Sequence, residues 1–488
     1  MLAHHYLTAL ELLTATGADT SGIRERAVPA LHDAAERAMS LNAYGTAAGF
    51  LSHAMQLLQS PDDASPELLL AAGRAFGMAG RRGDELERAL AAFEARGDRE
   101  RAAETAIELS RRDWHRGDTS AARAWIDRAE GLVEGARPSR ARAAVLAEGA
   151  RIAMVNYEPD AALRLSAAAI EVAGELGEVG IRADAMVTRG ACLASGGDPD
   201  GLRMVEDAIA LVGGRGRIAG RGWTNLAAAK SMAGEIRDAV RVSEEGLRLS
   251  TTEGDGQGAT FLRGGLCAGR YSLGNWDDAL VLADELLSAP DGFHYLDSLA
   301  LDIMSRILEA RGDVATARTD IERAVAIARE TGEAQAIWPT ITNAARHALR
   351  HDRREEADHL MREVENSLAE TDGIGDPDEW QVVLVLTLTD LGRPEAAARL
   401  AERLPPVFWG KVCRAVLDGA PEAGADLLAT RGEQPLQAEL RVRAARRLVE
   451  EGRSVEAERQ LSMARAFYRG VGAVAFLRAA EEVLAAAS

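Results

Sequence analysis

The chain has 488 residues, a formal net charge of −19 and an aromatic content of only 4%. So large a negative charge disfavours nucleic acid and anionic membrane surfaces as partners, because both are polyanions. The sequence contains neither a run of the ~20 apolar residues that a spanning helix needs nor the basic flank and apolar core of a secretory signal. We therefore expect a soluble, cytoplasmic protein.

Two residue types limit the chemistry that this chain offers. Lys230 and Lys411 are the only lysines, so a phosphate-loop or Schiff-base lysine would have to be one of them. The three cysteines, Cys192, Cys267 and Cys413, lie far apart without any paired spacing. Their pattern is typical of small buried side chains in a reducing compartment.

A helix-ending junction recurs every 37 to 40 residues from near the start of the chain to residue 392. In each, Gly, Asn or Asp follows an apolar helical stretch, and a small residue commonly stands five positions later. The junctions are Asn42, Gly80, Gly117, Asn156, Gly196, Gly234, Gly274, Gly312, Asp352 and Gly392. A period this regular predicts an all-α solenoid of stacked helix pairs, each burying its apolar face against its neighbours.

The chain order predicts one long array and a less regular end. Residues 1–404 are expected to form about ten helix pairs. After Gly392 the rhythm falters at several prolines, so residues 405–488 are predicted to form a degenerate repeat and capping helices. The Asp- and Gly-rich segment 371–379 fits a flexible joint best. The apolar run 382–388 comes nearest to a strand, but it lies inside a helical unit.

One turn resembles a known repeat family. The segment from Leu273 to Leu280 reads Leu-Gly-Asn-Trp-Asp-Asp-Ala-Leu, and it resembles the turn of tetratricopeptide repeats, in which Gly, an aromatic residue and Ala follow in this order. The resemblance implies a right-handed superhelix of tetratricopeptide-like repeats of about 37–40 residues. This period is longer than the commonest form of the repeat.

A wider resemblance covers both ends of the chain. The opening from His4 to Leu12 and the terminal segment from Ala466 to Ala473 resemble the tetratricopeptide tail that follows an AAA-type ATPase in bacterial class III adenylate/guanylate cyclases. The repeat arms of maltose-regulator-like transcriptional regulators are also similar. The resemblance implies a regulatory arm whose partner is an ATPase or cyclase module, in cis or in trans. Any ATPase or cyclase activity would reside in a separate or missing N-terminal part.

No catalytic or cofactor motif accompanies this architecture in the sequence. Lys230 precedes Ser231, but Ala229 stands where a phosphate loop requires Gly, and the stretch has a helical pattern. We therefore expect no enzyme activity and no cofactor.

Two histidines raise the question of a metal site. His347 and His351 lie four residues apart on one predicted helix, with Asp352, Glu355 and His359 nearby, so a metal site is geometrically conceivable. However, no Glu follows the first His as a metallopeptidase requires. A solvated helix face is the preferred interpretation, and no metal is predicted.

The first helix of each pair is expected to line the inner surface of the array. The polar residues predicted on this surface are Arg111, Thr224, Arg306, Thr342, Asn343 and Arg346. Guanidinium groups there could pair with carboxylates of an acidic or extended peptide, although each could equally be solvated surface. The leading hypothesis is a non-enzymatic protein- or peptide-binding regulatory module, acting as scaffold or signalling arm. The alternative is a small-molecule-sensing domain of a transcriptional regulator.

Overall fold

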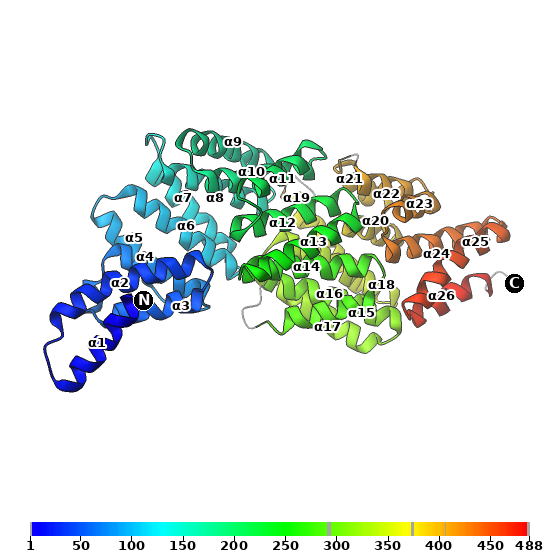
Figure 1. Cartoon of the computed structure of the whole chain (residues 1–488). Coiled ribbons are helices and arrows are strands. Elements are labelled where there is room, and N and C mark those ends of the chain that lie inside the picture. The colour runs from blue at the N-terminus through cyan, green and yellow to red at the C-terminus, as the bar shows by residue number, and fades with distance from the viewer. Residues whose placement is uncertain (1, 290–293, 372–374, 406, 486–488) are drawn as a thin grey trace. The chain divides into compact units, whose positions relative to one another are not determined.

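The structure, a computed structural model, describes residues 2–289, 294–371, 375–405 and 407–485. Within these ranges the chain forms 26 α-helices, one short 3-10 helix at Pro61–Asp63 and no β-strand (Figure 1). The predicted all-α class is confirmed. The strand-like run 382–388 lies within a helix, as expected.

Helix–turn–helix pairs follow one another along most of the chain. After α1 (Leu2–Thr16), the first helices of the pairs are α2 (Ser21–Ser40), α4 (Pro66–Met78), α6 (Arg99–His115), α8 (Arg140–Val155), α10 (Val179–Ser195), α12 (Gly216–Met232), α14 (Gly256–Ser272), α16 (His294–Arg311), α18 (Ala334–Arg350) and α20 (Glu379–Asp390). The second helices are α3 (Tyr44–Gln56), α5 (Glu85–Ala95), α7 (Thr119–Val133), α9 (Pro159–Leu176), α11 (Asp200–Leu211), α13 (Ile236–Thr252), α15 (Trp276–Leu287), α17 (Val314–Thr331), α19 (Arg354–Ala369) and α21 (Pro394–Glu402). The remaining helices are α22 (Phe408–Leu417), α23 (Pro421–Arg431), α24 (Gln434–Glu450), α25 (Ser454–Gly470) and α26 (Val474–Ala485).

At each junction, a residue in the left-handed backbone conformation ends the first helix. Eight of the ten predicted positions adopt positive φ, including Asp352 at 58°. In the other two junctions the left-handed residue comes one position later, at Tyr157 and Gly197. A left-handed residue turns the chain and lets its own N–H reach back to the helix that it ends. The predicted period therefore corresponds to real helix ends, with an error of one residue in two of them.

The residue after a junction can also start the second helix. Gly117 has φ 80°, and the carboxylate of Asp118 accepts a hydrogen bond from the backbone N–H of Ala121 at 2.9 Å. This cap satisfies one of the amides that the first turn leaves unpaired. Ala122, five positions after Gly117, is fully buried. The small side chain lets the two helices of the pair approach closely.

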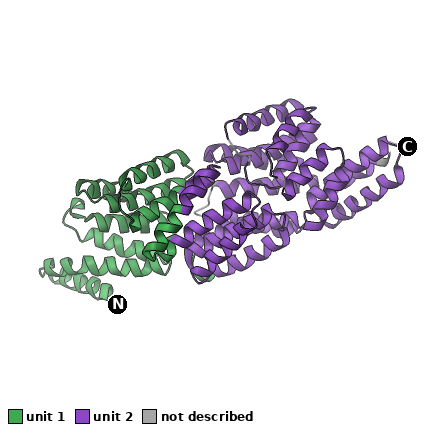
Figure 2. Ribbon diagram, turned by 90° about the horizontal axis from the view of Figure 1, so that it is seen from above, with its two compact units in different colours: residues 1–149, 168–181, 251–255 green, residues 150–167, 182–250, 256–488 purple. Residues whose placement is uncertain are grey.

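The chain divides into two compact units (Figure 2). Unit 1 comprises residues 1–149, 168–181 and 251–255, and unit 2 comprises residues 150–167, 182–250 and 256–488. The boundary predicted at residue 404 concerns the repeat pattern rather than compactness, and it stays a prediction. Of the predicted joint at 371–379, residues 372–374 lie outside the described residues, and residues 375–379 lead into α20.

Unit 2 closes on itself, unlike an extended array in which each repeat contacts only its neighbours. Trp409 on α22 donates its indole N–H to the carbonyl of Ser231 on α12 at 3.1 Å. Gln434 on α24 donates its amide to the carbonyl of Leu273 at 2.7 Å. Helix α24 also contacts α14, and α26 contacts α16. The C-terminal helices thus return to first helices that lie about 160 to 180 residues earlier in the chain.

The cysteines and the apolar helices agree in part with the sequence-based expectations. Cys267 and Cys413 are buried and Cys192 is half-buried; burial raises the pKa of each thiol to about 12. Such thiols stay protonated and unreactive.

Among the helices that the structure describes, none is both long and apolar enough to cross a membrane.

Candidate binding site

First helices of unit 2 line two cavities. The first, about 320 Å³ in volume, is lined by α12, α13, α14, α16, α18, the start of α20 and the segment that precedes it. We call it the acidic cavity; its charged lining residues are Asp302, Arg306, Asp376, Asp378 and Glu379. The second, about 460 Å³, is lined chiefly by α16, α18, α20, α24 and α26. We call it the ion-pair cavity, after the paired side chains Glu309, Arg346, Arg350, Asp390, Glu439 and Arg443.

Tyr271, Arg306 and Asn343 line both cavities. Arg306 lies with its guanidinium carbon 4.3 Å from the centroid of the Tyr271 ring, and it donates to Glu379 Oε1 at 2.6 Å. The same Arg306 lies 3.7 Å from Asp302 on its own helix. Tyr271, Arg306 and Asn343 therefore form a common wall between the two cavities.

A polar stripe on α16 supplies side chains to both cavities. Ser298, Asp302, Ser305 and Glu309 are all at most 4% exposed, and their spacing of four, three and four residues places them on one helix face. Ser298 and Ser305 donate to carbonyls of α17. Ser298 and Asp302 line the acidic cavity, and Ser305 and Glu309 line the ion-pair cavity.

The acidic cavity holds carboxylates that have few partners. Asp302 Oδ2 accepts a hydrogen bond from the side-chain amide of Asn343 at 3.0 Å, and Asp376 accepts one from the hydroxyl of Ser195 at 2.6 Å. Asp302 Oδ1 and Glu379 Oε2 are buried, and neither has a hydrogen-bond partner within the described part of the chain. A buried polar atom without a partner is costly, so these oxygens need an explanation.

The pKa values in the acidic cavity are displaced upward. Burial raises the pKa of Asp302 to about 7, and Glu379 adds to the shift while Arg306 opposes it. Burial and the neighbouring Glu379 raise the pKa of Asp378 to about 7 as well. The pKa of Asp376 is raised by burial. Burial is the main cause of each shift, because it disfavours the ionised form of a carboxyl group.

Aromatic side chains form much of the remaining wall of the acidic cavity. They are Tyr157, Phe261, Tyr271, Tyr295, Trp338 and Trp380. Tyr157 stacks on Trp338 with ring centroids 5.3 Å apart, and Trp338 lies 6.1 Å from Trp380. The cavity thus combines apolar ring faces with carboxylates.

In the ion-pair cavity every one of the named carboxylates meets at least one guanidinium. Arg346 donates to Asp390 at 2.5 Å and to Glu439, and Arg350 donates to Glu439 at 2.6 Å. Arg443 forms a two-point contact with Asp390. These pairs join α18, α20 and α24, so ion pairs hold together helices whose paired residues are 44 to 93 residues apart in the chain.

The pKa values in the ion-pair cavity are displaced downward. Burial opposes ionisation of Glu439, but Arg346 and Arg350 outweigh it and lower its pKa to about 2. Burial likewise opposes ionisation of Asp390, and Arg443 and Arg346 reverse the effect and lower its pKa. Positively charged neighbours keep these buried carboxylates ionised.

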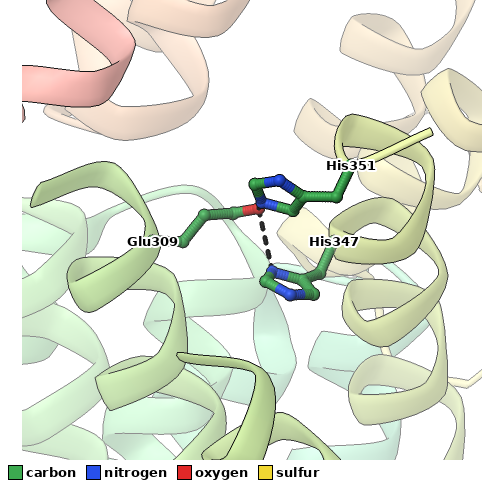
Figure 3. A group of neighbouring side chains, drawn as sticks. All are labelled: Glu309, His347 and His351. Atoms are coloured by element: carbon green, nitrogen blue, oxygen red, sulfur yellow. Dashed lines mark hydrogen bonds and ion pairs between the residues drawn. The ribbon is translucent and has the colours of Figure 1, made fainter. Parts of the chain in front are cut away.

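Glu309 lies between His347 of α18 and His351, the C-cap residue of that helix (Figure 3). Its Oε1 is 2.9 Å from His347 Nδ1 and 3.0 Å from His351 Nε2, while its Oε2 accepts from Arg350 at 2.9 Å. Burial disfavours its charge, yet Arg350 and the two histidines together lower the pKa of Glu309. The predicted solvated helix face is wrong for His347, which is only 4% exposed because α18 turns this face toward α16.

This histidine–glutamate cluster has the composition of a transition-metal site. Its three ligand atoms lie within 4.8 Å of one another, and zinc accepts two imidazoles and a carboxylate. However, Arg350 already neutralises Glu309, and a divalent cation would add charge beside a guanidinium. We therefore interpret the cluster as an anchor for the buried carboxylate.

The structure brings together four of the six residues predicted on the inner surface. Thr224 lines the acidic cavity, Arg346 lines the ion-pair cavity, and Arg306 and Asn343 line both. Their role in binding a partner stays a prediction.

The other two predicted residues lie elsewhere. Thr342 is fully buried and lines neither cavity. Arg111 belongs to unit 1, where it donates to Glu148 at 2.9 Å.

Comparisons with known proteins concern the fold. No protein-family model matches the chain, and no curated protein sequence is found to match it. The chain is similar to the solved apo form of the quorum sensor NprR from B. thuringiensis, with 13% identity over 75% of this chain and 98% of that one, at a TM-score of 0.42. It is also similar to a Rap protein complexed with competence and sporulation factor, with 12% identity over 70% and 97% of the two chains, at a TM-score of 0.49. A human IFIT1 dimer with m7Gppp-AAAA shares 14% identity over 87% and 94%, at a TM-score of 0.43.

Proposed function

We propose that the protein is a non-enzymatic regulatory module that binds a peptide or an extended protein segment in the two cavities of unit 2. The observation that carries this proposal is the common wall formed by Tyr271, Arg306 and Asn343. Because these residues line both cavities, the cavities adjoin each other, and polar and aromatic side chains line each of them. An extended ligand could contact both.

A peptide backbone presents N–H and C=O groups about every 3.3 Å, and each needs a partner when it is buried. The cavities offer partners of both kinds. The Asn343 amide can donate and accept, Arg306 donates, and Asp302 and Glu379 accept. The aromatic walls would cover apolar side chains. This mixture suits a peptide better than a purely apolar or a singly charged ligand.

A selection from a random-peptide display library tests the proposal directly. Ala268 on α14 is half-buried and lines the acidic cavity, so Ala268→Phe would fill part of it. Ala315 on α17 is exposed, and Ala315→Phe is the matched control. Peptides enriched on the wild-type protein should lose at least about tenfold in affinity on Ala268→Phe, a change of about 1.4 kcal/mol. They should bind Ala315→Phe as they bind the wild type. Equal affinity for all three proteins would place peptide binding outside this site.

The resemblance of the chain to the tails of ATPase-linked cyclases supports a more specific proposal. The array would bind an AAA-type ATPase or cyclase module, in cis or in trans, and the bound peptide would change the strength of that binding. Copurification of such a module from native cytoplasm, compared with and without a selected peptide, tests this step. Recovery that does not change with the peptide would separate peptide binding from partner control.

A small-molecule sensor is the second candidate, and the cavity volumes favour it. Volumes of about 320 and 460 Å³ fall in the range of small-ligand sites. Thermal-shift measurements with sugars and nucleotides distinguish it, because a ligand that binds only the folded state raises the melting temperature. A shift that Ala268→Phe abolishes would favour the sensor.

A further inference from the structure

The acidic cavity has an excess of negative charge in its wall. Four carboxyl groups line it, from Asp302, Asp376, Asp378 and Glu379, and Arg306 is the one basic side chain among the described lining residues. The single positive charge of Arg306 cannot neutralise all four. Its guanidinium already donates a hydrogen bond to Glu379 and lies 3.7 Å from Asp302. The cavity therefore has room for a further positive charge.

Two carboxylate oxygens mark where such a charge would bind. Asp302 is 4% exposed, and its Oδ1 has no hydrogen-bond partner among the described residues, although its Oδ2 is held by Asn343. Glu379 repeats this arrangement, with Oε1 held by Arg306 and Oε2 left over. In each acid, one carboxylate oxygen is thus held by a hydrogen bond, and the other is open to a ligand.

The aromatic wall favours the same chemistry. Ring faces attract cations through their negative quadrupole, and a cation is bound more tightly where water is excluded. Trp338 stacks on Tyr157 and lies beside Trp380, and all three line the cavity together with Asp376 and Asp378. Aromatic faces next to carboxylates are typical of sites for ammonium and guanidinium groups rather than for metal ions, which prefer oxygen and nitrogen ligands on all sides.

We infer that the acidic cavity binds an organic cation, an ammonium or guanidinium group, between the free oxygens of Asp302 and Glu379 and the aromatic wall. This inference rests on the proposed function, since a lysine or arginine side chain of the bound peptide is the source that the function supplies. A free organic amine carries the same chemistry, and the experiment separates the two sources. Burial raises the pKa of Asp302 and Asp378, and the nearby Arg306 does not reverse that shift.

The experiment uses the peptides selected on the wild-type full chain. We expect a lysine or arginine at a fixed position among them. Calorimetric titration then compares an arginine peptide with its citrulline analogue, which has nearly the same shape and no charge. The wild-type protein should prefer arginine at least about tenfold. On Asp302→Asn the preference should fall to about twofold or less, because the open carboxylate oxygen is gone.

One control variant and one second cavity variant accompany this comparison. Asp278→Asn changes an exposed aspartate of α15 in the same way, and it should keep the full preference. Asp378→Asn removes a second lining carboxylate but keeps an N-cap residue for α20, so it should reduce the preference without unfolding the helix. Agmatine, a free guanidinium compound, is titrated into the same four proteins.

The outcomes distinguish this inference from the proposed function. Selected peptides without a basic residue that still lose binding on Ala268→Phe would overturn the cation assignment and leave the proposed function intact. Agmatine binding that requires Asp302, without any enriched peptide, would support the cation site and overturn the peptide proposal. Equal affinity for arginine and citrulline on the wild type would overturn the inference, and failure of both ligands would overturn both proposals.

Discussion

The two cavities of unit 2 bury similar acids with opposite effects on their ionisation. Glu439 on α24 and Asp302 on α16 both line a cavity, yet the pKa of Glu439 falls to about 2 while that of Asp302 rises to about 7. Burial opposes charge at both sites. The difference comes from guanidinium groups, of which Glu439 contacts two and Asp302 has one at 3.7 Å. Local pairing, rather than depth, decides which carboxylate is a structural anion and which is available to a ligand.

The largest effect is expected in the ion-pair cavity at Glu309. Glu309→Gln removes the charge that Arg350 and two histidines face, so it should reduce the free energy of unfolding by about 3–5 kcal/mol. Glu363→Gln, at the more exposed pair with Arg329, is the control and should cost no more than about 1 kcal/mol. Urea unfolding followed by circular dichroism measures both. Similar losses for the two variants would mean that burial adds nothing to this pair.

The contribution of Asp302 in the acidic cavity to stability should depend on pH. The pKa of Asp302 is raised in the folded state, so its contribution to stability is full below about pH 4 and is lost as the pH rises through 7. Arg306, Tyr271, Glu379 and Glu433 are the ionisable groups that act on this carboxyl or on its neighbours. Asp302→Asn cannot ionise, so its stability relative to the wild type should rise by about 2–3 kcal/mol between pH 5 and pH 8, because one pKa unit corresponds to about 1.4 kcal/mol.

Urea unfolding of both proteins at pH 5 and pH 8 checks this prediction, with the exposed Asp278→Asn as control. The control should shift the unfolding midpoint by the same small amount at both pH values. A destabilised Asp302→Asn at pH 8 would show that the Asp302 carboxylate is already well paired, and the contrast between the cavities would fail.

A smaller loss is expected where a carboxylate has two partners. Arg443→Met removes one guanidinium from Asp390, but Arg346 remains at 2.5 Å. We expect a loss of about 1 kcal/mol in the free energy of unfolding, because the buried charge keeps a partner. Arg323→Met on the exposed surface of α17 should cost less than about 0.5 kcal/mol. A loss of 3 kcal/mol or more for Arg443→Met would show that the pairs act as one indivisible network.

The smallest expected effect is that of zinc on the histidine–glutamate cluster. Arg350 already pairs with Glu309, so Zn²⁺ should not raise the melting temperature of the wild type. His347→Gln should respond to Zn²⁺ in the same way. A zinc-dependent rise in the wild type alone would reassign His347, His351 and Glu309 as metal ligands. Differential scanning fluorimetry over a zinc series provides the measurement.

The repeat could be predicted from the sequence because it depends on neighbours in the chain. Gly117 and Asp118 signal a helix end and a cap by residue type alone. The error at Asn156 has a physical cause, because Asn tolerates left-handed backbone better than Tyr, yet it is Tyr157 that adopts it. Predictions of this local kind fail by one residue at most in these junctions.

The site could be predicted only in part because its contacts join distant segments. Arg346 and Asn343 were expected on the inner surface, but Glu439 lies 93 residues from Arg346 and no spacing connects them. Asp302 and Glu309 were missed, although a signal existed. Together with Ser298 and Ser305 they form a polar stripe at helical spacing within an otherwise apolar helix face, which is unusual for a core helix and indicates a lined cavity.

The return of α22, α24 and α26 to earlier first helices has a consequence for how this protein tolerates change. An open solenoid can gain or lose a repeat at its end, because each unit depends only on the next. Here Trp409 donates to Ser231 and Gln434 donates to Leu273, and α24 and α26 line the ion-pair cavity. Repeat number in unit 2 is therefore fixed by ring closure, and inserting or deleting one helix pair between α14 and α22 should abolish both cavities while leaving each remaining pair able to form.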